Sequence, residues 1–226
     1  MIDKLLRFGH INCRCIAPDA SATRIIYILF PLQGTDRELA ELATESGAAM
    51  VSVTGMDWDN DLTPWVAPGA PAGEPPFQGL APAFLKLIND RVVPGAEHAL
   101  GVTPYRRQLV GVSLSGLFAL WQWMQSPLFD DIACLSGSFW YQGFVEWLSS
   151  ITIPQRSGLA WFCLGDMEAH TKVKAFQSVA TDTREVLAIL RAAGIHAEFR
   201  SVPGTHYQHL EPRLHLALRA LASATR

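Results

Sequence analysis

One serine in this chain stands in a setting that suits nucleophilic chemistry. Ser113 follows the apolar run Q-L-V-G-V (108–112) and precedes an apolar helical pattern that leaves from Leu117. A serine at a sharp turn from strand to helix is a nucleophile elbow, and the strained turn needs small residues two places before and after it. Gly111 and Ser115 occupy those places. The pattern predicts Ser113 as the nucleophile, because Ser115 in that role would set Leu117 against the turn.

A serine hydroxyl needs a base to react at neutral pH, and the base is usually a histidine oriented by a carboxylate. With an elbow serine, these groups follow in the order serine, acid, histidine, each past the end of a sheet strand. Gly-Asp-Met-Glu follows a predicted strand at 159–164, so Asp166 and Glu168 are both candidate acids. Pro-Gly-Thr-His follows a predicted strand at 196–202 and places His206 at the head of the last helix.

The other histidines suit the role of base less well. His209 is the nearby rival of His206. His196 opens a predicted strand and His215 lies within a predicted helix, so surface or packing roles suit both better. Of the seven histidines, His206 alone combines a loop position, a glycine-assisted turn and the required chain order.

The elements that must position these residues alternate between strand and helix, which predicts an α/β fold with a mostly parallel sheet and helices on both faces. A turn is expected at 92–95, where the sequence reads V-V-P-G. The predicted strands are 11–17, 24–32, 48–53, 105–112, 132–136, 159–164 and 196–202, and the predicted helices are 37–46, 80–91, 117–125, 143–148, 174–193 and 209–222.

Residues 54–79 hold five of the fourteen prolines and keep no lasting period, which predicts a long loop. Long loops in compact domains often form lids or substrate walls, although a merely connecting loop is the alternative. The aromatic residues Trp58, Trp65 and Phe77 suit an acyl or alcohol pocket, and equally suit packing as a lid or at a dimer contact.

The composition predicts one domain over residues 1–226, with 49% hydrophobic residues to fill its core. A formal net charge of −3 gives no electrostatic reason to bind nucleic acid. The sequence contains no uninterrupted run of about 18 apolar residues, so no membrane span is predicted. The first residues, M-I-D-K-L-L-R, lack the apolar centre and cleavage site of a signal peptide, so a cytoplasmic protein is expected.

The four cysteines do not predict a disulfide framework in a chain of this length. Cys134 and Cys163 lie in apolar strand-like runs and are expected to be buried. Cys13 and Cys15 fall on one face of a strand with no other zinc-type ligand nearby, which favours packing over metal or redox use. No pattern demands a metal, a nucleotide or a flavin, so no cofactor is expected.

The run L-V-G-V-S-L-S-G-L-F-A-L (109–120) resembles the elbow of the putative-esterase branch of the α/β-hydrolases. That branch includes siderophore (enterochelin-type) esterases, feruloyl esterases and the esterase D-like S-formylglutathione hydrolases. The resemblance runs from about residue 25 to the C terminus, and its other pieces are N-D-L-T-P (60–64), G-L-A-P-A-F-L (79–85), L-G-D-M-E (164–168), R-A-A-G-I-H (191–196) and P-G-T-H (203–206).

The resemblance implies an α/β-hydrolase fold and favours Glu168 over Asp166 as the acid, although some siderophore-esterase relatives use a Ser–His pair without a conventional acid. It also implies an oxyanion hole of two backbone N–H groups. The N–H of Leu114 is expected to supply one, and that of Gly34 or Thr35 the other. The alternative for this turn is that Thr35 or Asp36 caps the next helix, and both can hold together.

The leading hypothesis is a serine esterase, a carboxylester hydrolase that acts through an acyl-enzyme on a small or medium ester. Ser113, Glu168 and His206 would form its catalytic triad. An acyltransferase with the same site is one alternative, since water and an alcohol compete for the same acyl-enzyme. A non-catalytic binding protein of the same fold is the other. The natural substrate and the oligomeric state do not follow from the sequence.

Overall fold

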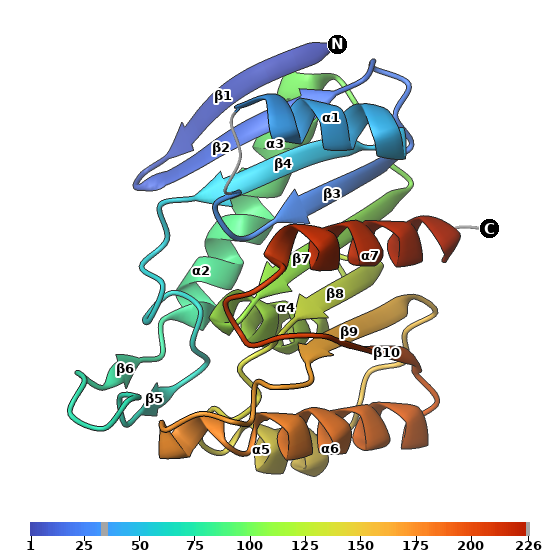
Figure 1. Cartoon of the computed structure of the whole chain (residues 1–226). Coiled ribbons are helices and arrows are strands. Elements are labelled where there is room, and N and C mark those ends of the chain that lie inside the picture. Colours follow the sequence, from blue (N-terminus) through green and yellow to red (C-terminus); the bar gives the residue numbers. More distant parts are fainter. Residues whose placement is uncertain (33–35, 225–226) are drawn as a thin grey trace.

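The computed structural model describes residues 1–32 and 36–224, and its centre is one eight-stranded sheet (Figure 1). The strand order is β1-β2-β4-β3-β7-β8-β9-β10. β2 is antiparallel to β1 and β4, and every other neighbouring pair is parallel, so the predicted mostly parallel sheet is confirmed. The strands are β1 (Ile2–Phe8), β2 (Ile11–Ala17), β3 (Arg24–Ile28), β4 (Ala49–Thr54), β7 (Arg106–Val112), β8 (Asp131–Leu135), β9 (Leu159–Gly165) and β10 (His196–Val202).

Helices cover both faces of the sheet, as expected from the alternating pattern. The first group, α1 (Asp36–Ser46) and α7 (Leu210–Ser223), lies in front of the sheet in Figure 1 and packs on one of two cores. The second group packs on the other core and consists of α2 (Ala81–Leu87), the π-helical turn η1 (Ile88–Val92), α3 (Val93–Leu100), α4 (Leu114–Gln125), α5 (Phe144–Ser150) and α6 (Val179–Ala192). None of the helices in the described ranges combines the length and apolar character that a membrane span requires.

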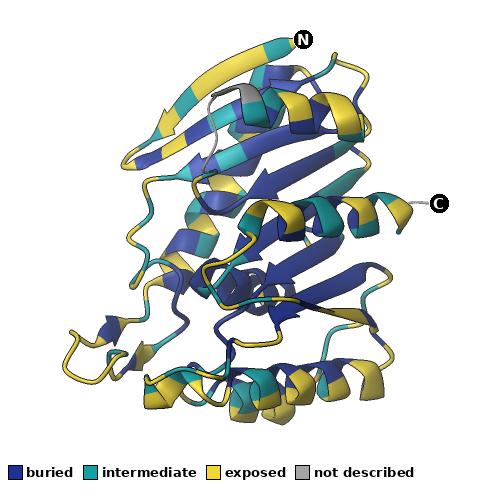
Figure 2. Ribbon diagram, in the orientation of Figure 1, coloured by how far each residue is buried: buried dark blue, intermediate teal, exposed yellow. Residues whose placement is uncertain are grey.

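Successive residues of the central strands enter opposite cores, because side chains alternate across a strand. Leu109 of β7 and Ile132 of β8 belong to the core under α4, while Val110 and Ala133 belong to the core under α1 and α7. Figure 2 shows β8 buried along its whole length, and the middle of β7 is buried as well. Burial on both faces explains why they read as continuous apolar runs in the sequence.

The chain reverses its direction of travel across the sheet at β3. From β3 it passes through α1 to β4 on one side, and it then returns to β7 on the other side of β3. Sheets of this kind bind their ligands outside the carboxyl ends of the strands at such a switch point. Ser113 follows the carboxyl end of β7 directly.

The predicted turn at 92–95 is wrong, because α2 continues through η1 directly into α3. Pro94 falls in the first turn of α3, where a helix tolerates a missing N–H. At Gly95 a Cβ would lie 2.6 Å from the ring of Phe8, so the glycine lets β1 pack on the helix. The helix ends instead at Gly101, which adopts φ 65°.

Other boundaries also differ from the predictions. The edge strand β1 was not expected, because its residues are mostly exposed and show no clear apolar alternation. β3 ends at Ile28 rather than at residue 32, although the N–H of Leu29 still donates to Val110 O at 2.9 Å. The helix predicted over 174–193 is divided into a 3₁₀ turn, η2 (Lys174–Phe176), and α6.

The predicted loop over 54–79 carries a two-stranded ribbon, β5 (Val66–Ala67) with β6 (Phe77–Gln78). Trp65 anchors it to the body of the protein: the indole Nε1 donates to Gln142 O at 2.9 Å, and the ring packs on Phe144. The role of this segment as a lid or substrate wall stays a prediction.

Candidate active site

Ser113 stands at a strained turn between β7 and α4. Its φ of 55° and ψ of −123° lie outside the regions that residues with a side chain normally adopt. Strain of this kind costs about 1–3 kcal/mol and persists only where the surroundings enforce it. Here the N–H of Ser113 donates to Leu135 O, and the N–H of Leu117 donates to Ser113 O, each at 3.0 Å.

Gly111 and Ser115, the two positions expected to be small, both contribute to the geometry of the turn. A Cβ on Gly111 would lie 2.1 Å from the carbonyl oxygen of Ser115, so this position accepts only glycine. Ser115 is fully buried, and its hydroxyl accepts the Val112 N–H and donates to Val112 O, both at 2.8 Å. Ser115 therefore closes the turn with two hydrogen bonds.

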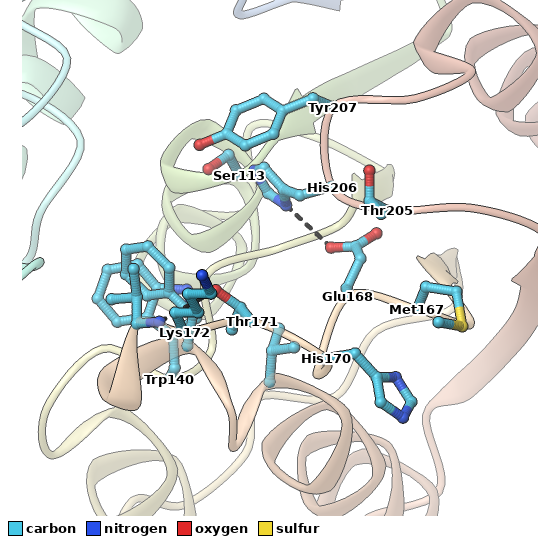
Figure 3. A pocket seen from close by; sticks show the side chains of 13 residues that line it. Ser113, Trp140, Met167, Glu168, His170, Thr171, Lys172, Thr205, His206 and Tyr207 are labelled. Atoms are coloured by element: carbon cyan, nitrogen blue, oxygen red, sulfur yellow. Dashed lines mark hydrogen bonds and ion pairs between the residues drawn. The ribbon is translucent and has the colours of Figure 1, made fainter.

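The loops after β9 and β10 bring Glu168 and His206 together. The Nδ1 atom of His206 lies 2.9 Å from Oε2 of Glu168, and Figure 3 shows the imidazole beside Ser113. Asp166, the other candidate acid, is exposed and accepts the N–H of Gly204 at 2.9 Å. It thus holds the loop that carries His206 without touching the imidazole.

A buried network fixes the second oxygen of Glu168. Oε1 accepts hydrogen bonds from the Gly165 N–H at 2.7 Å, the Ser136 hydroxyl at 2.6 Å and the Arg213 guanidinium at 2.8 Å. Burial acts to raise the pKa of this carboxyl, but the hydrogen bonds from His206, Ser136 and Gly165 outweigh it and hold the pKa below its usual value. Glu168 is therefore ionised at neutral pH.

The ionised carboxylate sets the tautomer of His206. A carboxylate can only accept hydrogen bonds, so Nδ1 of His206 must carry the proton that lies between them. In the neutral imidazole, Nε2 is then the acceptor. This is the tautomer that a general base beside a serine requires.

Ser113, Glu168 and His206 line one cavity of about 470 Å³. Trp140 and Phe176 form an aromatic wall, with ring centroids 4.5 Å apart. The segment from His170 to Phe176 and the exposed Tyr207 also border the cavity. The lining is mainly apolar, so the cavity suits an uncharged carbon chain or ring next to the serine.

Sequence reasoning missed three side chains of this site. Arg213 and Ser136 contact Glu168, and the hydroxyl of Ser138 lies 3.2 Å from the Ser113 hydroxyl. Arg213 looked like an ordinary charged residue of the last helix. The S-G-S run at 136–138, directly after a strand, was the available signal for the two serines.

The remaining candidates fall in different places. Leu114 begins α4, so its N–H is among the first four, which have no partner within the helix. Gly34 and Thr35, the candidates for the second oxyanion donor, lie outside the described residues. His209 is exposed at the start of α7 and is not a lining residue of the cavity around Ser113.

The aromatic residues of the 54–79 loop do not line that cavity. Phe77 is buried against Tyr141, and it reaches the cavity only through its contact with Trp140. Trp58 and Trp65 are partly buried and pack against the core under α4. None of the three residues lines this cavity, and their packing as a lid or at a dimer contact stays a prediction.

All four cysteines are free and buried, as expected. Burial raises the pKa of the thiols of Cys13, Cys15 and Cys163 to about 12 and that of Cys134 further still. Thiols of this kind react poorly, because the thiolate is the reactive form. Within residues 1–32 and 36–224, no three His, Cys, Asp or Glu side chains gather as a metal-binding group would.

Comparisons with known proteins point to esterases. A model of the family described as "Putative esterase" matches residues 27–214. The uncharacterized protein YbbA of Bacillus subtilis (strain 168) is 26% identical over 146 residues, which cover 62% of this chain and only 58% of YbbA.

Solved structures of two hydrolases share the fold. The siderophore hydrolase EstA from Aspergillus nidulans matches with a TM-score of 0.75 at 18% identity, covering 99% of this chain and 94% of EstA. An IroE-like serine hydrolase from Shewanella oneidensis matches with a TM-score of 0.77 at 17% identity, covering 98% and 79%. At these identities the likeness shows the α/β-hydrolase fold.

The close approach at Gly111 generates a test of the elbow. We expect Gly111→Ala to lower the free energy of unfolding by about 3 kcal/mol, because the new methyl group meets backbone that cannot move without opening the turn. Urea denaturation measures the change. Gly116→Ala is the matched control, since its Cβ would meet Gly137 Cα at 3.1 Å and the loss should stay near 1 kcal/mol. Equal losses would contradict this explanation.

The buried network around Glu168 should make the free energy of unfolding depend on pH. Because the pKa of folded Glu168 lies below the unfolded value of about 4.3, its stabilising effect is complete above that pH and disappears as the pH falls through the folded value. We expect Glu168→Gln to lower the free energy of unfolding by about 3–5 kcal/mol at pH 7, since buried Arg213 loses its negatively charged partner. The difference from wild type should shrink as the pH drops below about 4.

Urea denaturation at pH 7 and at pH 3 measures both differences. Glu185→Gln, which makes the same change on the exposed side of α6, is the control and should cost under about 0.5 kcal/mol. A Glu168→Gln penalty that stays constant with pH would show that the charge of the carboxylate does not stabilise the network.

Proposed function

This chain belongs to the Putative esterase family, and on that premise we propose that it is a serine carboxylester hydrolase that works through an acyl-enzyme. One observation carries the proposal. The strained Ser113, the His206 imidazole and the Glu168 carboxylate border a single cavity, with His206 Nδ1 bonded to the carboxylate. This arrangement matches the demands of nucleophilic acyl transfer.

In acylation, Ser113 Oγ attacks the carbonyl carbon of the ester. The proton of the hydroxyl passes to Nε2 of His206, which Glu168 keeps in the accepting tautomer. The carbonyl oxygen becomes an oxyanion, and the N–H of Leu114 at the start of α4 donates to it. Gly34 or Thr35 supplies the second donor in this proposal.

The tetrahedral intermediate then collapses. The imidazolium of His206 gives its proton to the departing alcohol, and the acyl group stays on Ser113. Water enters next, loses a proton to His206 and attacks the acyl carbon. Ser113 leaves as the protonated hydroxyl, and a carboxylic acid is released.

The cavity indicates which esters suit the site. Its volume of about 470 Å³ holds a small or medium ester. The Trp140–Phe176 wall places an apolar surface near the serine, so we propose that an apolar or aromatic part of the substrate packs there. That packing would stabilise binding by the removal of apolar surface from water.

Loss of the nucleophile tests the reaction. Ser113→Ala should reduce kcat/KM for short p-nitrophenyl esters by about 10³-fold or more, since only binding and the oxyanion donors remain. A fluorophosphonate should label wild type at Ser113, as read by mass spectrometry, and should leave the alanine variant unlabelled. Ser149→Ala, on the exposed side of α5, is the control and should keep full activity. Unlabelled folded wild type would favour a non-catalytic binding protein instead.

Removal of the aromatic wall tests the proposed substrate packing. Phe176→Ala should lower kcat/KM for esters with a bulky apolar acyl group by roughly tenfold, because the group loses a buried contact. Acetyl esters, which carry no bulky acyl group to pack on the wall, should change little. The control is Phe199→Ala on the edge strand β10, since Phe199 is partly exposed and does not line the cavity. An equal fall for both ester classes would place the acyl group elsewhere.

A further inference from the structure

Ser138 has no part in the reaction proposed above, yet it touches the atom that would react. Its hydroxyl oxygen lies 3.2 Å from Ser113 Oγ, and its backbone N–H donates to Ser113 O at 3.0 Å. Ser138 is fully buried. Within residues 1–32 and 36–224, its hydroxyl has no hydrogen-bond partner other than Ser113 Oγ.

The segment that carries Ser138 also touches the other end of the site. Ser136, two residues earlier, adopts φ 50° and donates its hydroxyl to Glu168 Oε1. Between the two serines, Gly137 packs closely on α4, since a Cβ on Gly116 would lie 3.1 Å from its Cα. One three-residue turn therefore contacts both the carboxylate and the nucleophile.

The groups from Arg213 through Glu168 to His206 form a series of hydrogen bonds, which continues to Ser113 in the reactive arrangement. The direction of each bond follows from which groups can only donate and which can only accept. Arg213 can only donate and the Glu168 carboxylate can only accept, so His206 donates from Nδ1 and accepts at Nε2. In the reactive arrangement, the Ser113 hydroxyl donates its one proton to Nε2. Its oxygen is then left as an acceptor, and the buried Ser138 hydroxyl must donate to it.

From this geometry we infer that Ser138 is a further catalytic residue, whose hydroxyl donates a hydrogen bond to Ser113 Oγ. The inference rests on the proposed esterase function. As the Ser113 proton moves to His206 Nε2, a lone pair of Oγ forms the bond to the carbonyl carbon. Ser138 keeps its own proton throughout. Its hydrogen bond is strongest while Oγ carries negative charge, both in the attack and when Oγ leaves the acyl-enzyme.

The position of Ser138 separates this role from substrate binding. Ser138 is fully buried and is not among the residues that line the cavity. Its removal should therefore slow the chemical steps without changing how the ester is held. A side chain that only filled space would affect folding, and would leave the reactivity of Ser113 in the folded protein unchanged.

The experiment compares Ser138→Ala with wild type, with Ser149→Ala as the control. We expect kcat for p-nitrophenyl esters and the rate at which a fluorophosphonate labels Ser113 both to fall about tenfold, the loss of one hydrogen bond of moderate strength. KM should change less than about twofold, and Ser149→Ala should match wild type. Circular dichroism and thermal unfolding confirm that the labelled protein is folded.

A second variant separates donation from packing. Ser138→Cys retains a weak donor in a slightly larger side chain, so its labelling rate should lie between those of wild type and Ser138→Ala. If folded Ser138→Ala labels at the wild-type rate, the role of Ser138 is overturned and the proposed esterase function is unaffected. A cysteine variant slower than the alanine variant would overturn it as well. Wild type that neither hydrolyses esters nor labels at Ser113 would overturn both this inference and the proposed function.

Discussion

The carboxylate of Glu168 is a charge placed inside the protein, and the elements around the site are arranged to satisfy it. An unpaired buried carboxylate would be strongly destabilising, so each of its oxygens needs donors. Those donors come from Gly165 at the end of β9, His206 after β10, Ser136 after β8 and Arg213 in α7. Three strand ends and one helix are therefore held to a single group. The position of the imidazole is a consequence of this arrangement.

Arg213 links the carboxylate to the backbone of the histidine loop. One terminal nitrogen donates to Glu168 Oε1, and the other donates to Thr205 O at 2.7 Å, one residue before His206. The side chain is 2% exposed, and a buried ion pair of this kind contributes little net stability compared with apolar packing. Its presence is better explained by geometry, because it fixes the loop and the acid to the same helix.

Much of this arrangement follows from the sequence because its causes are local. A buried strand followed by a small–x–Ser–x–small run requires an elbow, and loops after parallel strands must meet at one edge of the sheet. The sequence therefore predicts a serine, an acid at Asp166 or Glu168, and His206, in that order past three strand ends. The choice of Glu168 over Asp166 came from family resemblance, and only the structure shows which carboxylate contacts the imidazole.

What could not be predicted depends on contacts between distant residues. Arg213 lies 45 residues from Glu168, and nothing in the local pattern of α7 sets it apart from a surface arginine. The turn expected at 92–95 failed for a different, local reason, since Pro94 suits the first turn of a helix as well as a loop. Strand β1 was not predicted, because this edge strand buries too few side chains to produce an alternating apolar pattern in the sequence.

The S-G-S turn after β8 contacts two residues of the site that are far apart in the sequence, Ser113 and Glu168. Its backbone combines a local feature, the positive φ of Ser136, with the tight fit of Gly137 against α4. Its side chains act at a distance, with one hydroxyl on the carboxylate and the other on Ser113. Because the turn is fully buried, a shift that moved one contact would move the other. The three-residue turn thus connects Ser113 to Glu168, the residue that contacts His206, and so holds the strained elbow in register with the histidine loop.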